Sequence, residues 1–403
     1  MNYQKLNYYI FVFTLVFGVI FYDFISDLTN FSLIDEMLAA ILFIYWLLYS
    51  KAKRQKEFYI FLLISLFYLI HSLLYPHNVK AAIYTDFILQ IKPFIAFYTV
   101  YNIGFSFSIK DKQKIQKLCI ALAILILPIG LIAPGGGPAM NLFCGHSRYA
   151  TMSVVLGTTY LLFSKRKRKD LYITLFIYSI GLLSLRSKMF GFYAAFICII
   201  FLWRKIPRKP NLFTLKTILL SLILIFAIVY VAREKIIFYF ITGTENENNM
   251  FARPFLYMKA IEILHDYPFL GTGFGSYATF ASDKYYSPLY YDYDLYLNYE
   301  IGNGHFISDT YFPVFAQFGY IGLILFMWFW KRRYDTAKNN FLQTGDELTL
   351  KIVILIIIFF LIESIADSTF THNRGMCMMM ILALCLKYNQ NESNQTKNNL
   401  YSN

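Results

Sequence analysis

Charged residues are scarce in this chain of 403 amino acids, at 15% of the total, whereas hydrophobic residues make up 58%. The few charges leave apolar stretches of about 18 residues or more that recur along the chain. A stretch of that length can cross the roughly 30 Å hydrocarbon layer of a membrane as one helix. The scarcity of charge therefore argues against a soluble domain and predicts an all-α polytopic membrane protein.

Cysteine is also sparse, and its pattern excludes two kinds of scaffold. The five cysteines are scattered and odd in number, without a CxxC pair, so we expect neither a disulfide framework nor a cysteine metal site. No cluster of histidine, aspartate and glutamate has convincing metal-ligand spacing, and we expect no metal and no cofactor. A removable signal is missing as well, because the first apolar run, 8–21, is followed by Asp23 and Asp27 and not by a small-residue cleavage site.

The apolar segments predict twelve transmembrane helices and one large loop. We place the helices at 7–25, 33–50, 57–75, 84–105, 117–134, 149–164, 171–185, 188–203, 214–232, 311–330, 349–368 and 374–387. The chain then divides into nine helices within 1–232, an extracytoplasmic loop at 233–310, three helices within 311–387 and a tail at 388–403. That tail is polar and low in complexity, so we expect it to be disordered in the cytoplasm.

The excess of basic residues, 37 against 24 acidic ones, follows the predicted topology. Alternate connections between the helices are short and basic: KAKRQK, KDKQKIQK, SKRKRKD, WRKIPRKP and KRRYDTAKNN. Such connections stay on the cytoplasmic side of a membrane, so both termini are predicted there. Because this distribution explains the charge, and no basic stripe with stacking aromatics lies on a soluble domain, we expect no nucleic-acid partner.

The loop at 233–310 is about 80 residues long, and a loop of that length is usually functional or disordered. Its composition predicts order, because Phe255, Met258, Ile261, Ile263 and Leu264 have the spacing of an amphipathic helix. We expect this helix to lie on the outer membrane face and to end near Pro268.

Glycine and tyrosine dominate the next part of the loop. GTGFGSY at 271–277 lacks the third glycine of a GxGxxG motif and no GK[ST] follows, so we reject a nucleotide site and expect tight turns. The tyrosine-rich segment 283–300 and Tyr277 suit either contact with a glycan or the aromatic belt of the membrane interface. Tyr277, Tyr285 and Tyr286 are the candidate glycan contacts.

Cations on the predicted outer side are the sharper signal. Arg148, Arg186, Lys188 and Arg253 lie there against the positive-inside bias, and an ionised group near lipid needs a partner. Two interpretations stay open. Salt bridges to Glu262, Asp309, Glu363 or Asp367 would make the cations structural, whereas an anion site would use the guanidinium forks to bind phosphate oxygens. Lys92, within the fourth predicted helix, can extend the same polar region.

His305, Ser308 and Asp309 lie directly before the tenth predicted helix. His305 and Asp309 share one face if the first helical turn includes them, and either could then accept a proton from an attacking sugar hydroxyl. Alternatively, Ser308 or Asp309 caps the helix.

Three segments together resemble the O-antigen ligase and polymerase family, and within it the Wzy-type polysaccharide polymerases. They are RPFLYMKAIEILHDYPFLGTGFGSY at 253–277, GHFISDTYFPVFAQFGYIGLILF at 304–326 and SLRSKMFGFY at 184–193. The resemblance implies a GT-C-like fold and an inverting, metal-independent glycosyltransferase at the outer face of the bacterial inner membrane. Its substrates would be oligosaccharide repeat units linked to undecaprenyl diphosphate, with membrane lipid around it and a chain-length regulator as a possible partner.

The resemblance also assigns roles to residues. Arg186 and Arg253 would hold the donor diphosphate, with Arg148 and Lys188 as further contacts, and His305 would bind or deprotonate the acceptor. The ligase branch has a polar amide directly after its histidine, whereas Phe306 stands here, which favours a polymerase and leaves the base open between His305 and Asp309. The alternatives are a ligase of the same family and a flippase or other transporter, for which a repeat between the two halves is expected but not found.

Overall fold

The computed structural model describes residues 3–29, 33–50, 56–203 and 250–400, together with Leu219, Arg233 and Ile237. These residues form helices and turns without a β-strand. The helices of the bundle are α1 (Tyr3–Phe13) with the π-helical turn η1 (Thr14–Ile20), α2 (Tyr22–Thr29), α3 (Ile34–Tyr49), α4 (Lys56–Leu74), α5 (Lys80–Ile103), α6 (Ile109–Ile132), α7 (Pro138–Phe143), α8 (His146–Phe163), α9 (Arg168–Leu182), α10 (Ser187–Ile197) with η3 (Cys198–Leu202), α16 (Gly319–Thr344), α17 (Glu347–Ala366) and α18 (Asn373–Leu400).

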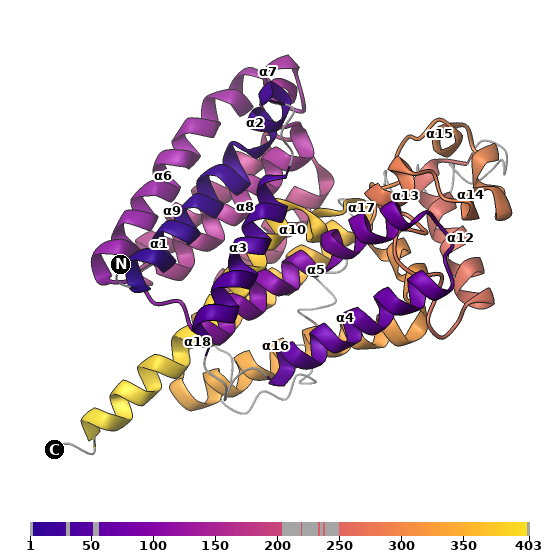
Figure 1. Ribbon diagram of the computed structural model, residues 1–403. Helices are drawn as coiled ribbons and strands as arrows, with labels where there is room; N and C mark the ends of the chain where they lie inside the picture. Colours follow the sequence, from indigo (N-terminus) through magenta and orange to yellow (C-terminus); the bar gives the residue numbers. More distant parts are fainter. Residues whose placement is uncertain are drawn as a thin grey trace.

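The segment 250–318 is folded into short helices. They are α12 (Ala252–Asp266), α13 (Phe280–Lys284), α14 (Leu289–Asp292), η6 (Leu295–Leu297), α15 (Tyr299–Gly302) and η7 (Phe312–Gln317). In Figure 1 this segment lies at the right of the bundle, and both chain ends lie at the left, with the C-terminus lowest. We call the bundle end that carries this segment the loop end, and the opposite end the basic end, because the basic connections before α6 and α9 lie there.

A helix occupies eleven of the twelve predicted ranges. The remaining range, 214–232, lies outside the described residues except for Leu219. The tenth helix was placed wrongly. It begins at Gly319 instead of residue 311, because Pro313 lies in the first turn of the separate 3-10 helix η7 and Gly319 adopts a positive φ of 62°. The last helix continues to Leu400, into the range where we expect a disordered tail, since no glycine or proline interrupts it there.

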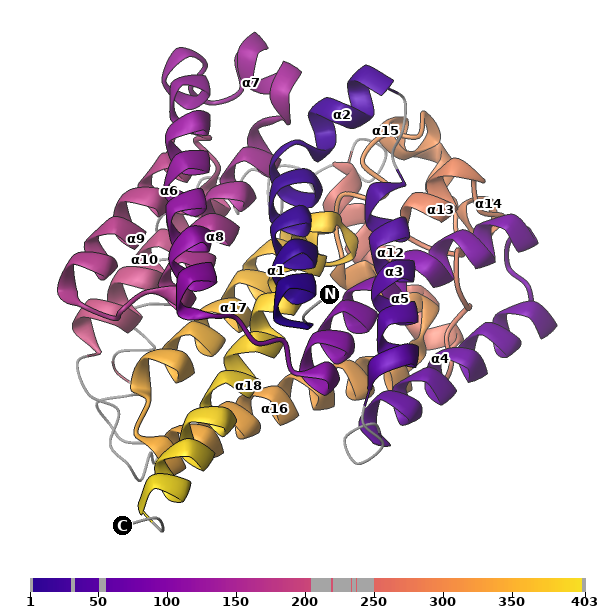
Figure 2. The ribbon, with the colours of Figure 1, turned by 60° about the vertical axis from the view of Figure 1, so that its left-hand side comes forward.

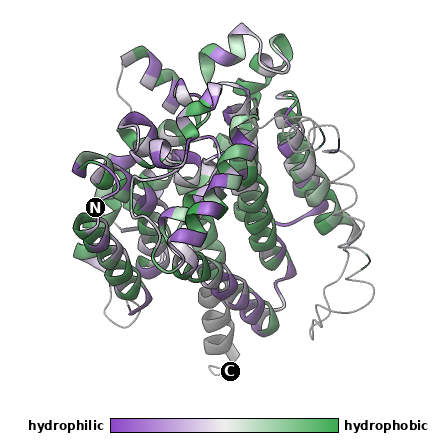
Figure 3. Cartoon of the chain, turned by 90° about the vertical axis from the view of Figure 1, so that its right-hand side faces the viewer, coloured by the Kyte–Doolittle hydropathy of each residue, from purple (hydrophilic) through white to green (hydrophobic). Residues whose placement is uncertain are grey.

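Several helices expose apolar side chains in the way that lipid contact requires. The helices α1 with η1, α4, α6 and α17 are long and apolar enough to cross a membrane, and α2 with α3 would add a fifth bent span. On α4 the side chains of Leu63, Leu74 and Phe67 are more than half exposed. Figure 3 shows hydrophobic residues along most of the bundle helices. The protein is therefore an all-α membrane protein.

The core of the bundle forms around α18. Its residues 376–386, MCMMMILALCL, contain no polar side chain and are all buried, as expected for a helix that is apolar on every side. The helix packs against α5, α8, α16 and α17 and against η1 (Figure 2). This arrangement brings the start of α18 and the end of α17 to the centre of the loop end.

The predicted loop helix is present as α12, but its apolar face differs from the expected one. Phe255 and Ile263 are buried, whereas Ile261 is 67% exposed and Met258 is 44% exposed. The buried side of α12 packs against η7, and Leu256 is also buried on α12. Whether the exposed side touches a membrane stays a prediction.

The glycine-rich segment 271–276 connects the loop to the bundle. The buried carboxylate of Asp86 on α5 accepts hydrogen bonds from Gly275 N at 2.8 Å and from Gln317 Nε2 at 3.0 Å. Gln317 Oε1 in turn accepts a bond from Ser276 N at 2.7 Å. Gly271 and Gly273 have φ values of 67° and 86°, which only glycine adopts without strain. The predicted tight turns are confirmed, and the close backbone approach is to the protein itself.

We expect Gly271→Ala to destabilise the protein far more than Gly145→Ala. Both glycines have a positive φ, so each alanine costs about 1–3 kcal/mol in backbone strain. A Cβ at residue 271 would also lie 2.4 Å from the Ala316 carbonyl oxygen, which adds ~1–3 kcal/mol of overpacking, whereas a Cβ at residue 145 meets no atom within 4 Å. Thermal melting in detergent measures both, and equal losses would contradict the close packing of this segment.

Candidate functional site

The end of α17 is the junction at which several predicted site segments meet. Lys188 Nζ, in the first turn of α10, donates to Glu363 Oε2 at 2.7 Å and to Asp367 Oδ2 at 2.8 Å. Ser147, beside Arg148 on α8, also donates to Asp367. Tyr257, one turn after Arg253 on α12, donates to the Ile365 carbonyl oxygen at 2.9 Å. The segments that carry Arg148, Lys188 and Arg253 therefore all contact residues 363–367.

Lys188 is itself held in a buried ion pair. Its side chain is 10% exposed and has two carboxylate partners, so Lys188 forms the structural salt bridges that were one of the two interpretations. An ammonium group shared between two carboxylates has little attraction left for a phosphate. The binding role expected for Lys188 stays a prediction, and its pairing argues against it.

Arg148 belongs to a second cluster that has an excess of positive charge. Its Nη1 donates to Asp23 Oδ1 at 2.8 Å, and Arg374 Nη2 donates to the other oxygen of the same carboxylate. Asp23 and Arg374 are buried, whereas the side chain of Arg148 is 53% exposed. Two guanidinium groups on one carboxylate leave one positive charge, and the exposed side of Arg148 can offer it to an anion.

His372 lies between these two clusters. The protein packed around it lowers the pKa of His372 to about 4; the charge of Asp367 opposes the shift, and Lys92, Arg148 and Arg374 reinforce it. Its Nε2 is 3.0 Å from Ser368 Oγ, and the residue is exposed. The neighbouring cations favour the neutral imidazole, whereas Asp367 favours the charged one.

Arg253 faces the candidate base Asp309. Its Nη2 donates to Asp309 Oδ2 at 3.0 Å, and the two side chains are 23% and 43% exposed. Asp309 was one of the acidic partners that the sequence suggested, so this salt bridge is confirmed. Because both side chains reach solvent, the pair contributes little to stability and can open for a ligand.

Asp283, on α13, is a third ionisable group beside this pair, and no sequence pattern pointed to it. Partial burial and the charge of Asp309 raise the pKa of Asp283 above its usual value, and His305 opposes the shift. A Cβ on Gly304 would lie 3.5 Å from Asp283 Oδ1, which places the carboxylate against the turn that carries His305. His305, Asp309 and Asp283 therefore surround one exposed turn.

That turn is not helical, so two predictions about it are wrong. Residues 305–311 precede η7 without a regular helix, and His305 and Asp309 do not share a helical face. Neither Ser308 nor Asp309 caps a helix, because the residues before η7 and α16 are Tyr311 and Phe318, and no side chain caps either helix. Helix capping is thereby excluded for Asp309, whereas its salt bridge with Arg253 is present.

Backbone strain adjoins two of the predicted site residues. Leu185, directly before Arg186, has a φ of 53°, and Phe306, directly after His305, has a φ of 63°. Positive φ values are costly for such side chains and tend to occur at functional sites. The strain cannot be seen in the sequence, because neither residue is a type that favours this conformation.

The remaining predicted cations are Lys92, whose charge reaches His372, and Arg186. Lys92 is buried and paired with Asp35 and with Glu36, at 2.9 Å from the latter. Arg186 caps the start of α10 through its backbone, and its side chain is half-buried.

Tyr277 was wrongly predicted to contact glycan. It is fully buried, and its hydroxyl donates to the Leu256 carbonyl oxygen at 2.7 Å. The adjoining glycine segment is bound to Asp86 and Gln317 and so holds Tyr277 inside the protein. Tyr285 and Tyr286 are partly exposed, and Tyr286 packs against Tyr290 and Tyr291. The most exposed tyrosines of the segment are Tyr299 at 79% and Tyr291 at 57%, which fit the solvent side of a glycan surface better.

Within the described ranges, no three His, Cys, Asp or Glu side chains are placed to hold a metal ion. The ionisable groups at the loop end can instead bind an anion through guanidinium groups and accept a proton through a carboxylate or imidazole. These are the two functions that transfer of a sugar from a phosphate requires of a protein.

Residues 171–327 match the family model Wzy_C, which is described as O-antigen ligase. The match covers less than half of the chain and contains α9, α10, α12, the glycine segment and the turn with His305 and Asp309. It supports the O-antigen ligase and polymerase family without separating the two activities. A search of curated proteins finds no match to this chain.

Proposed function

We propose that this protein is a polysaccharide polymerase of the bacterial inner membrane, within the family whose model matches residues 171–327. It transfers a growing glycan from undecaprenyl diphosphate onto the next lipid-linked repeat unit. The observation that carries the proposal is the Arg253–Asp309 pair beside Asp283 and His305, on a turn that no helix cap explains. The same proposal includes twelve spans, a GT-C-like fold and cytoplasmic termini. With this orientation the loop end lies on the extracytoplasmic side of the membrane.

The chemistry needs little more than charge and position. A hydroxyl of the acceptor sugar attacks the anomeric carbon, the bond from that carbon to the diphosphate oxygen breaks, and the hydroxyl proton passes to a base. The attack on the opposite side from the leaving group inverts the configuration. Negative charge grows on the departing diphosphate, and guanidinium groups placed there stabilise it.

Arg253 is the best placed of the cations for this role. Its partner is partly exposed, so a diphosphate can replace or join the carboxylate without the cost of breaking a buried pair. Arg148 offers its exposed side, and Arg186 follows the strained Leu185. His305, Asp309 and Asp283 are the available bases.

A ligase of the same family is the second candidate, since the matching family is described by that activity. Such an enzyme joins the finished glycan to a different acceptor. Phe306, in place of a polar amide, favours the polymerase. A flippase would need no base at the loop end.

An assay with purified protein distinguishes the three. Given only lipid-linked repeat units, we expect a ladder of products that grow by one unit at a time. Product formed only after addition of a separate lipid or protein acceptor would instead identify a ligase. Movement of the units across vesicles without longer products would identify a transporter.

A further inference from the structure

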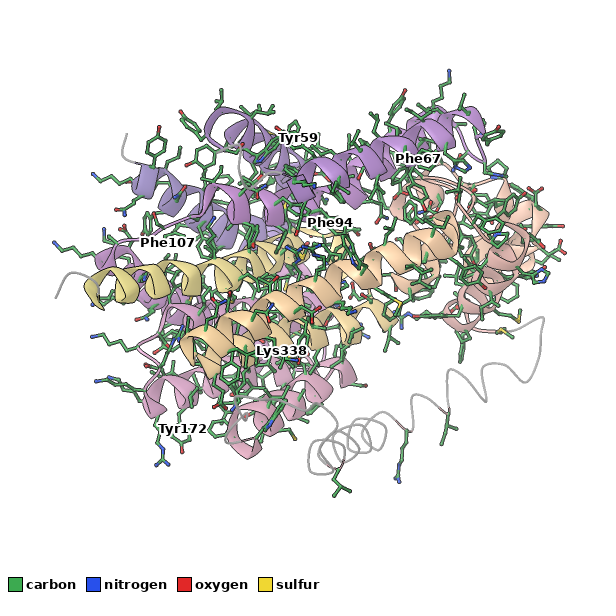
Figure 4. The ribbon with its side chains drawn as sticks, turned by 90° about the horizontal axis from the view of Figure 1, so that it is seen from below. Tyr59, Phe67, Phe94, Phe107, Tyr172 and Lys338 are labelled. Atoms are coloured by element: carbon green, nitrogen blue, oxygen red, sulfur yellow. The ribbon has the colours of Figure 1, made fainter. Side chains whose placement is uncertain are left out.

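A cavity of about 880 Å³ lies between α4, α5 and α16 and runs from Phe274 and Tyr311 of the loop-end segment to Lys56 and Arg333 at the basic end. Its walls are mainly aromatic and aliphatic, with Phe61, Phe94 and Phe329 packed against one another at ring distances of 4.7 and 5.1 Å. In Figure 4, Phe94 lies between the ribbons of α4 and α16. Along α4 the cavity extends from Lys56 to Tyr68, about 18 Å of helix, which is close to the depth of one leaflet.

The basic end of this cavity is strongly positive. Four cations line it, Lys56, Arg332, Arg333 and Lys387, against the single carboxylate of Glu57. Glu57 binds both arginines, at 2.6 Å from Arg333 Nη2. Even with Lys387 left out of the count, Lys56, Arg332 and Arg333 outnumber the one carboxylate that lines the cavity.

Two buried donors at this end have no acceptor among the described residues. Asn102 is 4% exposed and its Nδ2 has no hydrogen-bond partner, and the same holds for Nε of Arg333, which is 2% exposed. Both residues line the cavity. A buried donor without an acceptor is costly, so a ligand that supplies acceptor oxygens would be stabilised here.

We propose that this cavity binds an anionic glycerophospholipid of the leaflet at the basic end. The phosphate and ester oxygens accept from Asn102 Nδ2 and Arg333 Nε and neutralise the cations, while an acyl chain lies against the aromatic walls. Basic pockets between membrane helices bind anionic head groups in this way. The site goes beyond the proposed function, because the groups that would hold the head group, Asn102 and Arg333, lie at the basic end of the cavity and their binding needs no glycan.

Native mass spectrometry of the full chain, purified in detergent with phosphatidylglycerol and phosphatidylcholine in equal amounts, tests the proposal. We expect the wild type to retain phosphatidylglycerol selectively. Asn102→Leu removes a donor at nearly constant volume and should lower retention about tenfold. Arg332→Ala, at a side chain that is 46% exposed, should lower it about fivefold. Lys169→Ala, an exposed cation on α9 at the same end, is the matched control and should leave retention unchanged.

The melting temperature of Asn102→Leu should not fall, because the variant removes an unpaired amide. If it does fall, the lipid retention of Arg332→Ala is the result that tests the proposal. Equal retention of the two lipids, or wild-type retention in both cavity variants, would overturn the proposal. Preferential retention of undecaprenyl phosphate over phosphatidylglycerol in competition would also overturn it and assign the cavity to the substrate lipid. The lipid retained by the protein is measured without turnover. Failure of the proposed glycosyl transfer and failure of the lipid site can therefore be told apart.

Discussion

Replacing Arg253 with alanine is expected to lower the rate of chain elongation by about 10³-fold. The guanidinium faces Asp309 at the exposed turn, where it can stabilise the charge that develops on the leaving diphosphate. Removing one preorganised donor of this kind typically costs 10²–10³ in rate, and removing a charged arginine costs more. Arg253→Lys should recover only part of the rate, because an ammonium group cannot bind two oxygens in the fork geometry. Gel analysis of products from lipid-linked repeat units measures the loss.

Two controls separate this effect from misfolding. The Arg253–Asp309 pair is partly exposed, so its loss should change stability by less than ~1 kcal/mol, and the variant should insert and melt as the wild type does. Lys259→Ala breaks another cation–carboxylate pair on α12, with Glu262 at 2.8 Å, and should elongate glycans normally. Normal polymer length from Arg253→Ala would remove the main support for the enzymatic interpretation.

The second large effect is expected at His305. His305→Gln should lower the rate by about 10²–10⁴-fold, the usual contribution of a general base. A base acts only when it is deprotonated, so the wild-type rate should fall toward acidic pH. If His305 is the base, this acidic limb of the profile disappears in the glutamine variant.

The pH profile also distinguishes the neighbouring carboxylates. Were Asp283 the base, the limb would persist in His305→Gln and would move to higher pH, because the charge of His305 holds the pKa of Asp283 down. Asp283→Asn and Asp309→Asn complete the set. A full rate in His305→Gln together with a lost rate in Asp309→Asn would transfer the role to Asp309.

Helices form in most of the predicted ranges because the cause of a helix is local. An apolar run such as 376–386 has one low-energy form in lipid, since every backbone donor and acceptor must be paired within the helix. The glycine segment was also predictable in kind. Three glycines within five residues indicate backbone that packs closely or turns through positive φ, although not what it packs against.

The errors at the site arose from contacts between distant segments. Tyr277 shares its residue type with exposed tyrosines, and only the packing of the glycine segment against α5 and η7 buries it. The tenth helix was expected to start at 311, where the apolar run begins. The side chain of Gln317 instead forms hydrogen bonds with Asp86 and with the backbone of Ser276, and the apolar run does not encode these contacts.

The amino-acid sequence is sufficient to predict a helical membrane protein with alternating basic connections, and cations and a histidine beside one long loop. Hydrophobicity and charge act residue by residue, so these properties follow from residue types alone. Which cations are already neutralised depends on the folded protein. It paired Lys188 with two carboxylates, left Arg148 and Arg253 partly exposed, and brought Asp283 to the turn of His305, because the strength of a charge depends on neighbours that lie far away along the chain.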